Sequence, residues 1–128
     1  LVESIFINMC GVAGIFNLNE KKIEKTELIK FTDSLSHRGP DGAGYELLAD
    51  DTLGLGHRRL SILDLTKLGK QPMSYANERY WISYNGEVFN FYEIKKELEL
   101  KKYVFKSNTD TEVILAAYIE FGVKCLDK

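Results

Sequence analysis

Residues 44–62 read GYELLADDTLGLGHRRLSI, and this stretch predicts two strands joined by a tight turn. The runs 44–49 and 53–62 are rich in apolar residues and lie on either side of the pair Asp50-Asp51. Aspartate tolerates the backbone of short turns, so the arrangement is typical of a β-hairpin. Strands joined by such a turn run antiparallel, which favours an antiparallel sheet.

Three other segments are predicted to be strands. The glycine-punctuated run 10–18, CGVAGIFNL, suits a buried strand whose backbone is closely approached by a neighbouring segment. Aromatic and aliphatic residues alternate over 80–84, and Asn85-Gly86 then supplies residues that tolerate positive φ where the strand ends. A short strand is expected at 103–105.

Two segments have the apolar spacing of amphipathic helices. The first covers residues 22–35, places Leu28, Phe31 and Leu35 on one stripe, and ends near Ser36. The second has a shorter stripe of the same kind. Its apolar residues are Phe91, Ile94 and Leu98.

The third predicted helix has recognisable signals at both ends. Thr109 with Glu112 three residues later forms a capping box, and Gly122 lies where a glycine commonly ends a helix. The apolar stripe between them consists of Val113, Ala117 and Phe121. Three helices with strands that are grouped rather than strictly alternating predict an α+β fold with an antiparallel sheet.

The charge balance and hydropathy exclude several classes of protein. There are 17 basic and 19 acidic side chains and no long basic run, so neither nucleic acid nor an anionic membrane is an expected partner. The apolar stretches are too short to span a bilayer. Residues 1–8 contain Glu3 and no basic residue, unlike a secretory signal. We therefore expect a soluble, cytoplasmic protein.

The two cysteines need separate explanations, because their spacing suits neither a disulfide framework nor a metal site. Cys10 follows Met9 and precedes Gly11. Removal of the methionine would leave a free amino-terminal cysteine, whose α-amino group has a pKa of about 7.7–8.0 and can accept the thiol proton near neutral pH. The alternative for Cys10 is a buried core thiol, and Cys125 is most simply a small buried side chain.

Five further motifs follow Cys10 in an informative order. They are HRGPD at 37–41, GHRRLSILD at 56–64, QPM at 71–73, YNGE at 84–87 and SNTD at 107–110. In this order they closely resemble the glutaminase domain of asparagine synthetases and their amidotransferase relatives, whose amino-terminal cysteine is the nucleophile. The likeness covers residues 9–128, and the RGPD and RRLSILD segments resemble the asparagine synthetase branch in particular.

The resemblance implies three catalytic residues. Cys10 matches the thiolate that attacks the side-chain amide of glutamine. Asn85, through its side-chain amide, and Gly86, through its backbone N–H, match the oxyanion hole that stabilises the tetrahedral intermediate. The alternative for Asn85-Gly86 is a tight turn without a catalytic role.

Five residues are implied to bind the remainder of glutamine. Arg59 matches the residue that holds the α-carboxylate, for which a planar guanidinium offers two parallel hydrogen bonds. Asp110 and, less directly, Glu87 match the carboxylates that receive the α-ammonium group. Asp110 also lies at the start of the third predicted helix, so capping is the alternative role. The main-chain groups of Ile62 and Leu63 are expected to line the pocket.

The remaining motif, RGPDG at 38–42, is predicted to be a loop near the pocket, with Gly39 and Gly42 supplying flexibility. The alternative is an ordinary turn that ends the first helix. Arg58 should point away from Arg59, because successive side chains of an extended strand face opposite sides.

The resemblance also implies the whole architecture. It predicts a four-layer αββα sandwich of antiparallel sheets, of the type found in amino-terminal-nucleophile hydrolases, incomplete at the carboxyl end. Glutamine hydrolysis would need no metal or organic cofactor. A following synthetase domain would use ATP and Mg²⁺ to amidate an acceptor, aspartate by default, and homodimer formation is left open.

Residues 1–9 depart from the family pattern, because Cys10 is not the first residue. While they are attached, the nitrogen of Cys10 is an amide and the proposed base is absent, so the chain should be nearly inactive. The segment is an upstream stretch that the cell does not translate, a removable propeptide, or a permanent extension, and we favour the first. The competing functions are an inert glutaminase-like binding module and a hydrolase of another amide.

Overall fold

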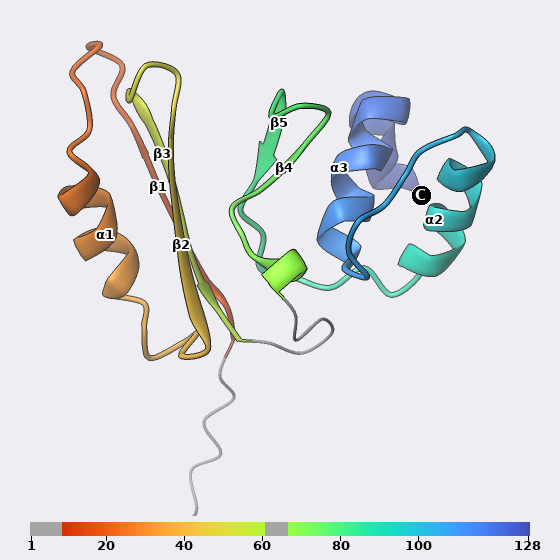
Figure 1. Ribbon diagram of the computed structural model, residues 1–128, viewed down its shortest axis with the longest axis horizontal. Coiled ribbons are helices and arrows are strands. Elements are labelled where there is room, and N and C mark those ends of the chain that lie inside the picture. The colour runs from red at the N-terminus through yellow and green to blue at the C-terminus, as the bar shows by residue number, and fades with distance from the viewer. Residues whose placement is uncertain (1–8, 61–66) are drawn as a thin grey trace, which may run out of the picture. The chain divides into compact units, whose positions relative to one another are not determined.

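The computed structural model describes residues 9–60 and 67–128, and the chain divides after Leu60 into two units (Figure 1). The first unit contains β1 (Gly11–Phe16), α1 (Lys25–Asp33), β2 (Gly42–Leu48) and β3 (Leu53–Arg59). The second unit contains the 3₁₀ turn η1 (Lys67–Gly69), β4 (Met73–Tyr75), β5 (Tyr80–Ile82), α2 (Phe91–Leu100), α3 (Asp110–Phe121) and the 3₁₀ segment η2 (Gly122–Asp127). The predicted α+β class with antiparallel sheets is confirmed.

The sheet of the first unit has the order β1-β3-β2, and both pairings are antiparallel. The predicted hairpin is confirmed as β2 and β3. Asp50 and Asp51 adopt φ values of 54° and 69°, and Thr52 N–H donates to Ala49 O at 3.1 Å. The register places Gly11 opposite Arg58, so the start of β1 lies beside the end of β3.

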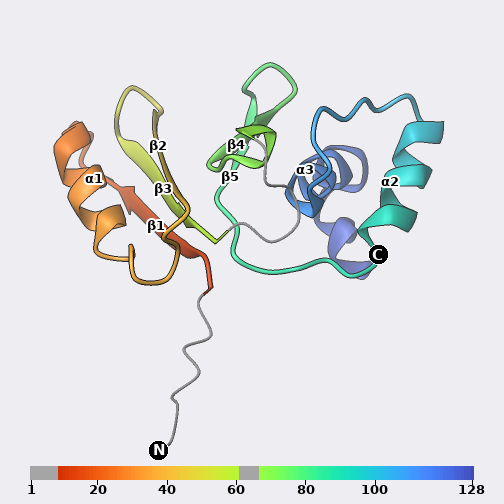
Figure 2. The ribbon, with the colours of Figure 1, turned by 60° about the horizontal axis from the view of Figure 1, so that its bottom comes forward.

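Helix α1 packs on one face of this sheet (Figure 2). Leu28 and Thr32 are fully buried there, and the glycines of β3 make room for them. A Cβ atom at Gly56 would lie 2.9 Å from Thr32 Cβ, so the close approach requires glycine. The predicted stripe is partly wrong, since Phe31 is 50% exposed. The face of α1 that contacts the sheet is therefore determined by the space above the glycines of β3, and not only by where the apolar side chains of the helix lie.

In the second unit, α3 contacts both β4 and β5 and also packs against α2. Figures 1 and 2 both show α3 between the small sheet and α2. This core confirms the predicted stripe of the second helix. Its buried side chains are Phe91, Ile94 and Leu98 of α2 and Val113, Ala116 and Ala117 of α3.

Helix α3 begins and ends as predicted, with one difference. Thr109 is the N-cap and its Oγ1 accepts from Glu112 N at 3.4 Å, and Gly122 has a φ of 59°. The Glu112 carboxylate does not complete the capping box. It accepts instead from the N–H groups of Lys106 and Ser107, the latter at 2.7 Å, and so fixes the segment before the helix.

The strand predicted at 103–105 is wrong, and β4 was not predicted. Tyr103 and Phe105 pack by their rings against Tyr75 of β4, with ring centroids 6.4 and 6.5 Å apart. Tyr75 Oη also donates to Val104 O at 2.8 Å. The alternating aromatic residues at 103 and 105 therefore pack on the core without forming a strand.

None of the helices in the described part of the chain combines the length and the apolar character that crossing a bilayer requires.

Candidate functional site

Cys10 lies directly before β1, where the antiparallel pairing brings it to the end of β3. Its Sγ lies 3.3 Å from Leu60 N and 3.5 Å from Leu60 O. Its own carbonyl oxygen accepts from Arg38 Nε at 3.3 Å. The Leu60 N–H is thus directed at the sulfur, and such a hydrogen bond strengthens when its acceptor becomes a thiolate.

The RGPD loop is held against β3. Arg58 Nε donates to Gly39 O at 3.0 Å, and Asp41 N–H donates to Arg59 O at 2.9 Å. A Cβ atom at Gly39 would lie 2.6 Å from Arg59 N and closer still to the backbone of Arg58. Gly39 therefore has a packing role in this structure, because no larger residue fits between the loop and the backbone of β3.

Arg58 and Arg59 point to opposite faces of the sheet, as predicted. Arg58 Nη1 forms an ion pair with Asp33 Oδ1 of α1 at 3.2 Å, so Arg58 lies on the helix-covered face. Tyr45 Oη donates to the same Oδ1 at 2.6 Å, and burial followed by this hydrogen bond raises the pKa of Tyr45. Strand alternation then directs Arg59 to the other face.

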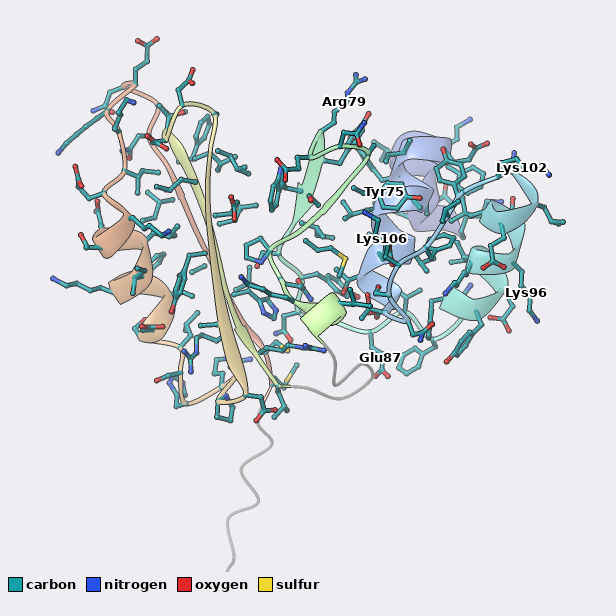
Figure 3. All side chains as sticks on the ribbon, viewed as in Figure 1. Tyr75, Arg79, Glu87, Lys96, Lys102 and Lys106 are labelled. Carbon is teal, nitrogen blue, oxygen red and sulfur yellow. The ribbon has the colours of Figure 1, made fainter. Side chains whose placement is uncertain are left out.

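Asn85, Gly86 and Glu87 are exposed in the loop between β5 and α2, where Figure 3 labels Glu87. Neither Asn85 nor Gly86 has a positive φ, so the positive-φ turn that the Asn-Gly pair suggested at the end of the strand is not formed. A Cβ atom at Gly86 would lie 2.6 Å from Tyr84 Cζ. A side chain at position 86 would therefore require the Tyr84 ring to shift.

This loop is attached at both ends. Tyr84 N–H donates to Gln71 Oε1 at 2.6 Å, which also explains why β5 ends two residues before Tyr84 rather than including it as predicted. Val88 N–H donates to Asp110 Oδ2 at 3.0 Å. Asp110 is 5% exposed and is the first residue of α3. Because Thr109 provides the cap, the capping alternative for Asp110 is wrong.

The electrostatics around the loop are negative. Burial raises the pKa of Tyr84, and the carboxylates of Asp110 and Glu87 raise it further. Both carboxylates therefore act on the same phenol, which stays protonated over the neutral range. A local field of this sign suits a bound ammonium group.

The predicted site residues fall into two groups. Cys10 and Arg59 belong to the first unit, at the same end of its sheet. The second unit contains the loop residues Asn85, Gly86 and Glu87 together with Asp110. Ile62 and Leu63 lie outside the described residues.

Sequence reasoning missed two contributors. The Leu60 N–H is a backbone group that no side-chain pattern reveals. Gln71 was quoted only as part of the QPM motif, yet its side chain is buried and bonded at both ends. A buried amide next to a proline gives no periodic signal, so only the motif itself could have drawn attention to it.

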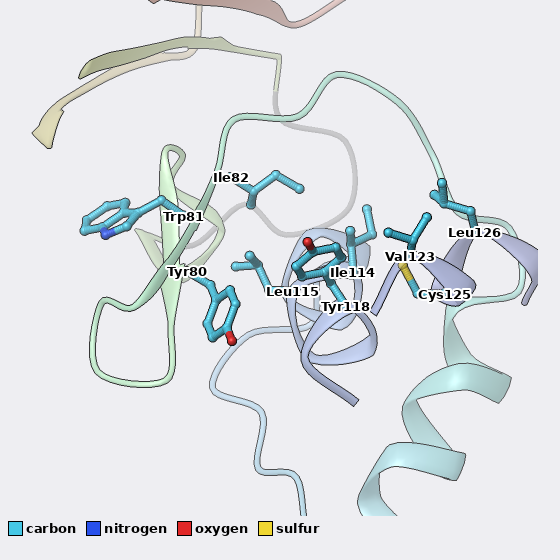
Figure 4. A pocket seen from close by; sticks show the side chains of 9 residues that line it. All are labelled: Tyr80, Trp81, Ile82, Ile114, Leu115, Tyr118, Val123, Cys125 and Leu126. Carbon is cyan, nitrogen blue, oxygen red and sulfur yellow. The ribbon is translucent and has the colours of Figure 1, made fainter. Parts of the chain in front are cut away.

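An apolar cavity of about 370 Å³ lies elsewhere in the second unit, between β5, α3 and η2 (Figure 4). Its lining includes Trp81, Tyr118 and the partly buried Cys125. None of the predicted site residues that the structure describes lines it. Glutamine needs charged partners at its α-carbon, so this cavity is not suited to that substrate. Within residues 9–60 and 67–128, no cluster of three or more His, Cys, Asp or Glu residues could hold a metal ion.

Comparison with known proteins gives a consistent result. Residues 9–128 match the family described as a glutamine amidotransferase domain. The chain is 44% identical over 123 residues to asparagine synthetase [glutamine-hydrolyzing] 1 of Bacillus subtilis, covering 94% of the chain and 19% of that protein. Asparagine synthetase B [glutamine-hydrolyzing] of Escherichia coli is 34% identical over 120 residues, covering 93% of the chain and 21% of that protein.

Asparagine synthetase [glutamine-hydrolyzing] of Zea mays is also 34% identical over 120 residues, with 93% of the chain and 20% of that protein covered. The chain thus spans about a fifth of the length of these curated relatives. The family match extends over nearly all of the sequence and includes every predicted site residue. The chain therefore belongs to the glutamine amidotransferase domain family.

Proposed function

We propose that this chain hydrolyses glutamine to glutamate and ammonia through a cysteinyl thioester. The thiolate of Cys10 adds to the side-chain carbonyl carbon, the C–N bond breaks, and ammonia leaves after taking up a proton. Water then attacks the thioester and releases glutamate. The observation that carries the proposal is the Leu60 N–H aimed at Cys10 Sγ from 3.3 Å, one residue after Arg59.

In this proposal Asn85 and Gly86 stabilise the tetrahedral oxyanion through the Asn85 amide and the Gly86 N–H. Their exposure leaves these donors accessible to a ligand, while the bonds at Tyr84 and Val88 fix the ends of the loop. Removing one donor of this kind typically lowers kcat by about 10²–10³-fold.

The remaining residues would select glutamine. Arg59 would bind the α-carboxylate, and Asp110 with Glu87 would bind the α-ammonium group, which the negative field at Tyr84 supports. The main-chain groups of Ile62 and Leu63 would complete the pocket. An amide that lacks the amino-acid head group would leave the charged side chains of the site without partners.

The four-layer αββα sandwich is the architecture we propose for the intact domain. In the first unit α1 covers one face of the sheet, and the other face exposes Val12 and Phe16, the latter by 64%. An apolar sheet face of this kind is suited to packing against a second sheet. This supports one helix layer and one sheet layer of the proposed four.

We further propose that the ammonia is used by a synthetase domain in a longer protein. The named activity of the relatives and their greater length support this. ATP and Mg²⁺ would act in that domain, with aspartate as the default acceptor, and glutamine hydrolysis itself would need no cofactor. We also propose that this longer protein is cytoplasmic and forms a homodimer.

The proposal requires removal of residues 1–9, so that the amino group of Cys10 is free to accept the thiol proton. The test uses the longer protein in two forms, one starting at Met9 and one retaining residues 1–8, with Cys10→Ala in the first form as control. Mass spectrometry establishes the amino terminus, and glutamate release is measured.

We expect hydrolysis only where Cys10 is the first residue. General-base assistance is worth about 10²–10⁴-fold, so the blocked form should fall by at least the lower figure. Undiminished hydrolysis by the blocked form would refute the role of the α-amino group. If the first form is folded, has lost Met9 so that Cys10 is its first residue, and still releases no glutamate, the inert binding module is supported instead.

A further inference from the structure

The donor loop, residues 84–88, has no regular structure of its own, and Asn85 and Gly86 at its centre are exposed. The positions of the two proposed oxyanion donors must therefore be set by the loop's attachments. One attachment is the bond from Val88 N–H to Asp110, a residue already assigned to substrate binding. A second attachment is a residue with no assigned role.

Gln71 provides this second attachment. Its Oε1 accepts from Tyr84 N at 2.6 Å, one residue before Asn85. Its Nε2 donates to Thr111 Oγ1 of α3 at 3.2 Å. Gln71 is 9% exposed and Thr111 is more deeply buried. The side chain thus bridges the loop to the first turn of α3 through two hydrogen bonds, of which the one to Thr111 is buried and the one from Tyr84 is partly buried.

The chemistry of this bridge favours an amide. Tyr84 N–H can only donate, so the group facing it must accept, and the atom facing Thr111 must donate because the Thr111 hydroxyl donates to Asp110 Oδ1 at 3.4 Å. A neutral carboxamide offers one acceptor and one donor at this reach. An ionised glutamate would accept at both ends and would place a charge near the buried Asp110 carboxylate.

We propose that Gln71 is a positioning residue for glutamine hydrolysis, holding Asn85 and Gly86 at a fixed place relative to the start of α3. This inference rests on the proposed function. Gln71 touches neither substrate nor nucleophile in this role and acts through the loop. Small displacements of oxyanion donors weaken transition-state stabilisation while leaving the groups that bind the ground state in place.

The test uses Gln71→Met, which keeps the side-chain length and removes both hydrogen bonds, in the longer protein starting at Cys10. We expect kcat to fall by about 10–10²-fold, less than for direct loss of a donor. The KM for glutamine should change less than about threefold, because Arg59 and Asp110 lie outside the donor loop. Alkylation of Cys10 by iodoacetamide should keep its rate, since that reaction uses no oxyanion donor.

Gln71→Glu gives a signature that a purely structural role would not produce. When protonated, glutamic acid again offers one acceptor and one donor, so its kcat relative to the wild type should rise as the pH is lowered. Leu98→Ala, which removes a buried side chain of α2, serves as the control for lost stability. We expect it to lower Tm and to leave kcat of the folded protein unchanged.

A folded Gln71→Met variant with kcat within twofold of the wild type would overturn the inference and leave the proposed function intact. A wild type that releases no glutamate would overturn both. If Gln71→Met does not fold, Thr111→Val decides, because it removes the anchor of Gln71 and keeps the bond to Tyr84. A severalfold fall in kcat is then expected, and an unchanged kcat refutes the inference.

Discussion

Two glycines of the first unit differ sharply in what surrounds them, although both lie near Cys10 in the fold or the sequence. Gly39 packs against the backbone of Arg58 and Arg59, which has no freedom to move aside within a strand. Gly14 of β1 has Gly54 O as its nearest neighbour, and a Cβ atom there would lie 3.8 Å from it. The sequence shows two equivalent residues, and only the packing distinguishes them.

Substitution by alanine should therefore affect the two glycines differently. Gly39→Ala should destabilise the protein by about 1–3 kcal/mol, the usual cost of overpacking where the neighbours cannot relax. Gly14→Ala is the matched control, for which a small effect is expected. Chemical denaturation followed by circular dichroism gives both values, and equal stabilities would contradict the assigned role of Gly39.

The carboxylate of Glu120 joins α3 to the start of the segment that follows α2. Glu120 Oε1 lies 2.8 Å from Lys101 Nζ, and Glu120 Oε2 accepts from Tyr103 Oη at 3.1 Å. The hydrogen bond from Lys101 lowers the pKa of Glu120 most, with a smaller effect from Tyr103. The pKa of Lys101 is raised by the same bond.

A depressed folded-state pKa means that Glu120 contributes stability above its unfolded pKa, about 4.3, and loses it as the pH falls through the lower folded value. Glu120→Gln should therefore lower Tm at pH 7, and the difference from the wild type should shrink as the pH falls below the unfolded-state pKa of about 4.3. A difference that persists unchanged as the pH is lowered would exclude this origin.

Apolar periodicity and capping residues predicted some elements better than others. Helix α3 was predicted closely because Thr109 and Gly122 carry local signals that need no partner. The buried face of α1 and the state of 103–105 depended on neighbours, the glycines of β3 and the ring of Tyr75. Long-range contacts of this kind leave no regular spacing in the sequence.

For the whole molecule, the proposed substrate-binding charges come from both units, with Arg59 in the first and Asp110 in the second. Family membership was recognisable from the order of the motifs along the chain. The individual bonds that hold the motifs, such as those of Gln71 and Leu60, required the structure.

If the two residues bind opposite ends of one glutamine molecule, truncated analogues separate them. Arg59→Ala should weaken inhibition by glutaramate, which has the carboxylate but no ammonium group, and spare 4-aminobutanamide, which has the reverse. Asp110→Asn should show the opposite selectivity. Each loss should be about 10–10²-fold, the value of a charge-assisted hydrogen bond. Inhibition constants measured against glutamine hydrolysis give the answer, and parallel losses for both analogues would contradict the assignment.

The bond from Val88 N–H to the Asp110 carboxylate has a consequence for how the protein can change. Under the proposed function, one carboxylate serves an incoming cation and the loop that presents the donors. By thermodynamic linkage the two interactions are coupled. A change that strengthens binding of the cation by Asp110 also changes the position of the loop, and a change in the loop alters the affinity for the cation. Selectivity and turnover would share a single adjustable group, so neither could be refined by mutation without readjusting the other.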